Sequence, residues 1–528
     1  MNLALLSHEW LVIALGLGVL LADLWLPAPA KRKLGYVAAL GVGVILLYSL
    51  LAFTIEPGDV QYAFHQTYVL DGLALFFKRF FLVAALLVLL MSVEYADSFQ
   101  AGVGEFYALV LFALSGMLFA SSVNDFALLF VSLELITVTF YVLTSFERTR
   151  QASLEAGVKY LILGALSTSF TVFGIALVYG ISHQLNFGGL AAVAGQYGGN
   201  RLFLCGLVLV MVGLGFKIAA FPFQIWAPDV YQGAPSPTTA FLAVGSKAAG
   251  FVLLLRVLFT AVPGVTAQWS NLLIVVSAVT ILYGNLCAIP QRNIKRLLGY
   301  SSIAHAGYML LGIAALAVSL GPHGSQTPTA GASAVLYYLS GYLFTVLGAF
   351  TVICLVLRQA EGEDIAALAG LHQRSPLLAA TMALAMVSLA GIPPLAGFFG
   401  KFLLLKSVIS EAPAHPGYYC LAFTTVAGVI ISLYYYFGVV RAMYWTRETP
   451  SLSPIPTSGP MRLSLYACAA GMLFLGLCPA PMVRCASQAV QGLGLPAGVT
   501  PGVSAPKKSP NGLAFSPPAI HIPPINLN

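Results

Sequence analysis

The chain has 528 residues, of which 59% are hydrophobic and only 8% are charged. A soluble domain carries roughly 25% charged residues, so a soluble fold of this length could not cover its surface with polar groups. The net charge of +7 does not indicate nucleic-acid binding, because the densest basic groups, at residues 31–33 and 292–296, lie between apolar runs. The composition predicts an integral membrane protein with no nucleic-acid partner.

Apolar runs follow one another along the chain, each long enough for the roughly 20 residues of one helical crossing. The first run is not a signal peptide, because His8 and Glu9 stand where a basic segment should be. We therefore expect an all-α integral membrane protein with about fourteen transmembrane helices. The predicted spans lie near residues 9–26, 35–55, 71–95, 104–122, 125–146, 156–181, 202–226, 236–261, 270–289, 296–319, 333–357, 376–409, 417–441 and 462–484.

Basic residues fall in every second loop between these spans, and the intervening loops carry almost none. By the positive-inside rule the basic loops are cytoplasmic, so both termini are expected in the periplasm. Lys78 and Arg79 do not fit this pattern, because they lie near the outer end of the third span. The loop residues are Lys31, Arg32, Lys33, Arg148, Arg150, Arg292, Lys295, Arg296, Arg358, Arg374, Arg441, Arg447 and Arg462.

Two spans are interrupted by proline, the seventh at Pro222 and the twelfth at Pro393 and Pro394. Proline removes a backbone donor and clashes with the preceding turn, so each helix should break there. The breaks lie five spans apart, which predicts two five-helix repeats that are inverted relative to each other. The predicted organisation is three N-terminal helices at 1–98, a first repeat at 104–262, a second repeat at 270–441, a last helix at 442–485, and a disordered Pro-rich tail at 486–528.

Five ionisable residues on five different spans lie near mid-membrane: Glu134, Lys217, Lys247, His305 and Lys401. Placing an ionised side chain at the bilayer centre costs at least about 2.5–3.5 kcal/mol of free energy, so each of these residues is expected to have a structural or functional role. Structural roles are open to four of them. Lys217 and Lys401 can extend toward an interface, Glu134 and Lys217 can form a structural ion pair, and His305 can be a core histidine bonded to a carbonyl. As a group the five residues predict a path for proton transfer.

Charged residues near the ends of spans have simpler explanations than the five residues near mid-membrane. Arg256 and Asp23 are expected to extend toward the interface. Glu155 and Lys159 are four residues apart at the start of a helix, which predicts an intrahelical ion pair. The seven cysteines lie almost entirely in apolar runs without the spacing of a metal or iron–sulfur site, so we expect no redox centre in this chain.

Five segments resemble subunit N of the proton-pumping NADH-quinone oxidoreductase, respiratory complex I. The N type fits better than the M type, which has glutamate at the position of Lys401, and better than the L type, which adds a long lateral helix. The matching segments are 153–160 (SLEAGVKY), 213–217 (GLGFK), 226–235 (WAPDVYQGAP), 293–305 (NIKRLLGYSSIAH) and 388–402 (SLAGIPPLAGFFGKF).

The resemblance implies an antiporter-like fold and a role for four of the buried charges. Glu134 and Lys217 match the acid–lysine pair of the input half, Lys247 the central connecting lysine, and Lys401 the output lysine. His305 matches a motif position whose role is less settled.

The resemblance also implies partners: other membrane subunits of complex I, the peripheral arm, the lipid bilayer and protons. FMN, iron–sulfur clusters and quinone are expected in partner subunits, and none in this one. The expected location is the cell inner membrane, in preference to a plastid or thylakoid membrane. Two alternatives remain: a subunit of a multisubunit sodium/proton antiporter, and a non-pumping structural scaffold, in which neutralised lysines would leave transport intact.

Overall fold

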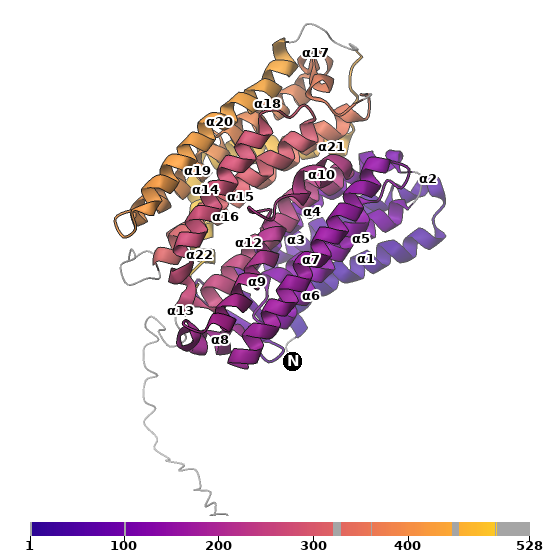
Figure 1. Cartoon of the computed structure of the whole chain (residues 1–528). Helices are drawn as coiled ribbons and strands as arrows, with labels where there is room; N and C mark the ends of the chain where they lie inside the picture. Colours follow the sequence, from indigo (N-terminus) through magenta and orange to yellow (C-terminus); the bar gives the residue numbers. More distant parts are fainter. Residues whose placement is uncertain are drawn as a thin grey trace, which may run out of the picture. The chain divides into compact units, whose positions relative to one another are not determined.

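The computed structural model describes residues 3–99, 102–319, 329–360, 362–445, 453–491 and 493. Long helices dominate these residues and run in roughly a common direction (Figure 1). Thirteen helical stretches of the described part are long and apolar enough to cross a membrane. The other crossing predicted from the sequence, 376–409, consists of two shorter helices, α18 (Pro376–Ala390) and α19 (Ala396–Glu411). The prediction of a many-helix membrane protein is confirmed.

The first three long helices are α1 (Ser7–Trp25), α3 (Leu34–Ala52) and α4 (Gly72–Tyr95), with the short α2 (Ala28–Lys31) between the first two. A hairpin of β1 (Val60–Ala63) and β2 (Tyr68–Asp71) precedes α4, and its strands pair antiparallel with Val60 opposite Asp71. This short hairpin was not predicted from the sequence. Strands of four residues are too short to show a clear alternation of polar and apolar residues.

The helices of the predicted first repeat include one that is interrupted. They are α5 (Val103–Ser121), α6 (Phe126–Thr144), α7 (Gln151–Ser182), α9 (Arg201–Ile218), α10 (Trp226–Gly233), α11 (Ser236–Phe241) and α12 (Lys247–Arg256). Short helices α8 (Phe187–Ala194) and α13 (Pro263–Thr266) lie in connections. π-Helical segments at Leu242–Ser246 and Val257–Ala261 flank α12. Such segments are frequent at functional sites.

The helices of the predicted second repeat follow the same order: α14 (Ser270–Ala288), α15 (Ile294–Ser319), α16 (Ala330–Leu357), α18, α19 and α20 (Gly417–Trp445), with the short α17 (Leu371–Arg374) before α18. The two sets of helices, one from each predicted repeat, pack in a similar way. In the first, α7 contacts both halves of the broken helix, α9 and α10; in the second, α16 contacts both α18 and α19. This correspondence supports the proposed repeats.

Two helices close the described chain, α21 (Gly459–Leu477) and α22 (Pro479–Ala489). Helix α22 therefore continues past residue 486, where the tail was predicted to start. Residues 492 and 494–528 of that predicted tail, and Arg447 of one predicted basic loop, lie outside the described residues.

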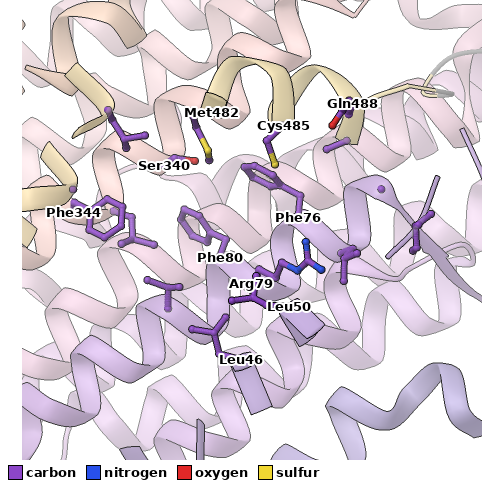
Figure 2. Close-up of a pocket in the computed structure, with 18 of the residues that line it drawn as sticks. Leu46, Leu50, Phe76, Arg79, Phe80, Ser340, Phe344, Met482, Cys485 and Gln488 are labelled. Atoms are coloured by element: carbon purple, nitrogen blue, oxygen red, sulfur yellow. The ribbon is translucent and has the colours of Figure 1, made fainter. Parts of the chain in front are cut away.

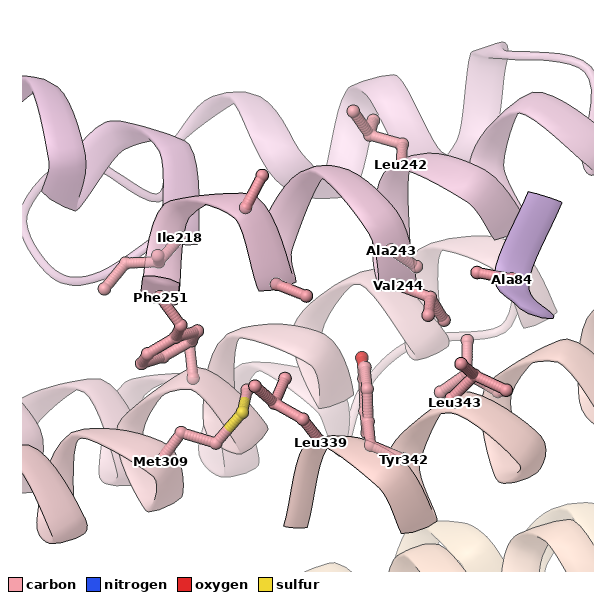
Figure 3. Close-up of a cluster of buried hydrophobic side chains, with 14 of the residues drawn as sticks. Ala84, Ile218, Leu242, Ala243, Val244, Phe251, Met309, Leu339, Tyr342 and Leu343 are labelled. Atoms are coloured by element: carbon pink, nitrogen blue, oxygen red, sulfur yellow. The ribbon is translucent and has the colours of Figure 1, made fainter. Parts of the chain in front are cut away.

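The centre of the bundle is formed by the stretch Ser236–Ala261 and by α15 and α16. The most apolar windows of the first two are completely buried, and that of α16 is 94% buried. Apolar side chains from these helices meet around Tyr342, whose hydroxyl points toward the helix that carries Ala243 and Val244 (Figure 3). The predicted repeats therefore meet in an apolar layer that surrounds a few polar groups.

Ion pairs join the predicted cytoplasmic loops directly to one another, which places those loops on one face of the protein. Arg32 and Arg358 both contact Glu94 and Asp97. In the same region Glu363 is paired with Arg150 and with Lys295.

Candidate functional site

Lys217 lies at the first helix break. Helix α9 ends one residue later, and Ala219 takes the left-handed backbone conformation with φ of 59°. The Lys217 side chain is 3% exposed, and its ammonium donates a hydrogen bond of 2.9 Å to the Thr137 hydroxyl on α6. The indole Nε1 of Trp226 donates to the Phe216 carbonyl at 2.9 Å, which satisfies one backbone group at the broken end.

Glu134 lies on α6, one turn before Thr137. Its carboxylate is half-buried and accepts a hydrogen bond of 2.7 Å from the hydroxyl of Thr168 on α7. No ion pair joins Glu134 to Lys217 in the described chain, although the two groups interact electrostatically. The alternative of a direct structural ion pair is therefore wrong, and Thr137 occupies the place next to the ammonium.

Three buried hydroxyl groups lie between the region of Glu134 and that of Lys247. The Tyr141, Tyr160 and Ser246 hydroxyls are buried and have no hydrogen-bond partner among the described residues. The rings of Tyr141 and Tyr160 lie 5.3 Å apart, and Tyr160 also faces Ser246, the residue before Lys247. These hydroxyls therefore lie between the surroundings of Glu134 and those of Lys247.

Lys247 connects the two sets of helices. It follows the π-helical segment Leu242–Ser246, is 3% exposed, and donates to both the carbonyl and the hydroxyl of Ser302 on α15. The Ser302 hydroxyl also bonds to the hydroxyls of Tyr231, at 2.8 Å, and Tyr342, at 3.0 Å. Ser302 is therefore a junction between a lysine of the first set and tyrosines of both sets.

His305 lies one turn further along α15 and is 2% exposed. Its Nδ1 is hydrogen-bonded to the Tyr338 hydroxyl, and its Nε2 lies 3.0 Å from the Tyr436 hydroxyl. The predicted alternative of a histidine bonded to a backbone carbonyl is therefore wrong. Tyr436 also bonds to Ser301, and the His305 ring centroid is 5.2 Å from that of Tyr342. An imidazole between two phenols can accept a proton on one nitrogen and donate one from the other.

Asn285 connects two further tyrosines beyond His305. Its amide donates to the Tyr308 hydroxyl at 3.1 Å, and its oxygen accepts from the Tyr435 hydroxyl at 2.9 Å. The ammonium of Lys401 lies 4.9 Å from the centroid of the Tyr308 ring, within the range of a cation–π contact.

Lys401 is held by the second helix break. Its ammonium donates to the carbonyls of Leu389 at 2.7 Å and Ala390 at 3.2 Å, at the negative end of α18. Gly391 follows with φ of 85°, and an added Cβ there would lie 2.9 Å from Cδ of Lys401. Glycine thus allows both the turn and the close approach of the lysine.

The five predicted residues therefore do not form one contact cluster. They are distributed along a row of hydroxyl, amide and imidazole groups that crosses both sets of helices. None of the three lysines forms an ion pair with an acidic residue of the described chain. A buried ammonium without a carboxylate in contact is weakly stabilised in its charged form.

The structure also shows ion pairs of Arg256 and of Lys78 that were not predicted from the sequence. Arg256, expected to extend toward the interface, is 2% exposed and pairs with Asp71, so that prediction was wrong. Lys78 and Glu9 form an ion pair whose side chains are both 0% exposed, and Tyr68 bonds to both. These charged residues lie inside apolar runs, which indicates that they are buried. The sequence does not show which distant helix supplies the partner of each one.

The predicted intrahelical pair of Glu155 and Lys159 is confirmed, with a separation of 2.6 Å between the ammonium and the carboxylate. The described residues contain no group of three His, Cys, Asp or Glu side chains that could hold a metal ion. The absence of a redox cofactor in this subunit stays a prediction.

A family model described as "NADH:quinone oxidoreductase/Mrp antiporter, TM" matches residues 123–430. The fold thus belongs to the class of antiporter-like membrane subunits. The chain is 38% identical to NADH-quinone oxidoreductase subunit N of Desulforamulus reducens, over 93% of this chain and 98% of that protein. A chain of respiratory complex I from Thermus thermophilus with bound aureothin is 32% identical, with a TM-score of 0.73, and the alignment covers 90% of this chain and 99% of that one.

A chain of the Mrp complex from a Dietzia species has the same fold, with a TM-score of 0.77, 19% identity, and coverage of 94% of this chain and 98% of that one. At that identity the likeness concerns the fold alone. The chain belongs to the NADH-quinone oxidoreductase subunit N family, which confirms the resemblance found in the sequence.

Proposed function

We propose that this membrane-arm subunit of the proton-pumping NADH-quinone oxidoreductase moves protons along the row from Glu134 through Lys217, Lys247 and His305 to Lys401. Each lysine takes up a proton from one neighbour and releases it to the next when a nearby charge changes. Quinone reduction in partner subunits supplies the driving change, and this chain contributes no redox chemistry of its own.

The observation that supports the proposal is a series of neighbouring polar and aromatic groups between Lys247 and Lys401. Ser302 binds Lys247 and contacts Tyr342, whose ring lies beside that of His305. His305 bonds to Tyr436, whose ring packs against that of Tyr435. Tyr435 is linked through Asn285 to Tyr308, whose ring faces the Lys401 ammonium. Hydroxyl and imidazole groups can each accept one proton while donating another. Such a row, set in apolar surroundings, has the chemistry of a proton relay.

Between Glu134 and Lys247 the transfer relies on the buried hydroxyls of Tyr141, Tyr160 and Ser246. Buried hydroxyls without a protein partner are usually satisfied by ordered water, which would join these groups into a path. Entry of the proton at Glu134 fits its half-buried position, since it is the most accessible of the five residues.

We further propose that the subunit lies in the bacterial inner membrane, with other membrane subunits and the peripheral arm as partners. The face on which Arg32, Arg150, Lys295 and Arg358 gather is cytoplasmic by the positive-inside rule, and both termini are then periplasmic. FMN, iron–sulfur clusters and quinone are assigned to those partners.

The test is proton translocation measured together with NADH oxidation, in inverted membrane vesicles that carry the intact complex. Glu134→Gln and Lys217→Ala should each reduce translocation strongly, and electron transfer should slow as well in a tightly coupled complex. The double variant should be little worse than either single variant, because both changes disable one unit.

Glu155→Gln is the matched control, since it neutralises a carboxylate that is 59% exposed and lies outside the path. Its rates should equal those of the wild type. Wild-type rates and proton stoichiometry in both Glu134→Gln and Lys217→Ala would refute the path.

A further inference from the structure

A cavity of about 560 Å³ lies outside the proposed proton path, between α3, α4, α16, α21 and α22. This volume is within the range of about 300–1,000 Å³ that is usual for ligand pockets. Most of its lining is apolar, and Figure 2 shows Leu46, Leu50, Phe76, Phe80 and Phe344 around it. An apolar cavity in a membrane-spanning part of the protein suits a hydrocarbon chain.

Arg79 is the one cationic side chain among the residues that line this cavity, and its guanidinium lies among the apolar side chains in Figure 2. Its Nη2 donates to the carbonyls of Ser49 at 2.8 Å and Phe53 at 2.6 Å, at the end of α3. Within the described chain Arg79 forms no ion pair, and its Nη1 makes no hydrogen bond. A half-buried guanidinium with a spare donor and no carboxylate is suited to an anionic oxygen ligand.

Glu56 is the acidic residue of the lining, and its side chain is exposed. It lies three residues beyond Phe53, whose carbonyl Arg79 binds, in the connection that leaves α3. The cavity therefore has a positive group at the end of α3 and a negative group further along the chain, at its rim.

We propose that this cavity binds a glycerophospholipid with an amine headgroup. An acyl chain fills the space between Phe76, Phe80 and Phe344, the phosphate contacts Arg79, and the headgroup ammonium contacts Glu56. The two protein charges match the order of charges in such a lipid, with the phosphate nearer the hydrocarbon and the amine further out. The site is independent of the proton path.

The experiment uses the intact complex, purified and reconstituted into nanodiscs of defined lipid, with bound phospholipid counted by native mass spectrometry. Wild-type complex should retain phosphatidylethanolamine in preference to phosphatidylglycerol. Arg79→Gln should weaken retention by at least about tenfold, the loss expected for one charge-assisted hydrogen bond. Leu50→Trp should also lower retention by filling the cavity from its exposed edge.

Glu56→Lys separates the headgroup contact from any effect on folding, because residue 56 is exposed. This variant should reverse the preference, so that phosphatidylglycerol is retained over phosphatidylethanolamine. Arg462→Gln, which removes an exposed cation that does not line the cavity, is the control and should match the wild type. Two results would overturn the proposal. One is that the wild type retains no phospholipid, as when a neighbouring subunit fills the cavity. The other is that Arg79→Gln, Leu50→Trp and Glu56→Lys all retain the two lipids as the wild type does.

Discussion

Arg256 and Asp71 form a two-point ion pair, with Nη2 to Oδ1 at 2.8 Å and Nη1 to Oδ2 at 2.9 Å. Arg256 also donates to the Ser121 carbonyl, and Asp71 caps α4 by accepting from the Ala74 amide at 2.8 Å. The pair therefore joins the ends of α12, α4 and α5. It fixes the helix that carries Lys247 against α4, the third of the N-terminal helices, and against α5.

Arg256→Met should destabilise the protein by about 3–5 kcal/mol, because it leaves a buried carboxylate without its partner. Thermal unfolding of the purified complex in detergent measures the change. Arg201→Gln, at an exposed arginine, is the control and should change little. An unchanged unfolding temperature in Arg256→Met would mean that the pair does not stabilise the fold.

Thr137 and Thr139 allow a matched test of the contact to Lys217. Both hydroxyls donate to the carbonyl four residues earlier on α6, at 2.5 Å, but only Thr137 also accepts from the lysine, at 2.9 Å. Thr137→Val should lower proton translocation by about tenfold or more, since a hydrogen bond to a charged group contributes about 1.5–3 kcal/mol. Thr139→Val should pump at the wild-type rate, and equal losses in the two variants would argue against a role for this contact.

Tyr436 joins His305 to Ser301 through one hydroxyl group. Tyr436→Phe keeps the ring and removes that hydroxyl, so packing should be preserved while the relay is interrupted. We expect reduced translocation with little loss of stability, on the order of 1 kcal/mol. Tyr418→Phe on the same helix removes a hydroxyl that donates to the Ala314 carbonyl at 2.7 Å and serves as the control. If both variants pump equally well, His305 does not pass protons through Tyr436.

The ion pairs of Glu363 with Arg150 and Lys295 predict that the stability of the protein depends on pH. Burial raises the pKa of its carboxyl, but the charges of Lys295 and Arg150 lower it by more, so the pKa lies below its usual value of 4.5. A carboxyl with a lowered pKa in the folded state stabilises the fold above its unfolded pKa, and this contribution is lost as the pH falls through the lowered value.

Glu363→Gln removes that contribution at every pH. Its unfolding temperature should therefore lie below that of the wild type at pH 7, and the difference should shrink once the pH falls below 4.5. A series of melting curves from neutral to acidic pH measures this difference. A difference that stays constant into the acidic range would contradict the linkage.

The sequence by itself determined the spans, the two helix breaks and the presence of buried charge. These features are local: about 20 apolar residues make a crossing, proline interrupts a helix, and an ionised group within an apolar run stands out against the cost of burying it. For the same reason Glu134, Lys217, Lys247, His305 and Lys401 were found one residue at a time.

Only the tertiary structure decided which group faces which. Lys217 contacts Thr137 in place of Glu134, and Arg256 finds Asp71 at a separation of 185 residues. A helical pattern shows that a side chain is buried, but its partner depends on how distant helices rotate and pack against one another. The junction at Ser302 and the cavity beside Arg79 likewise exist only because helices far apart in the sequence meet in space.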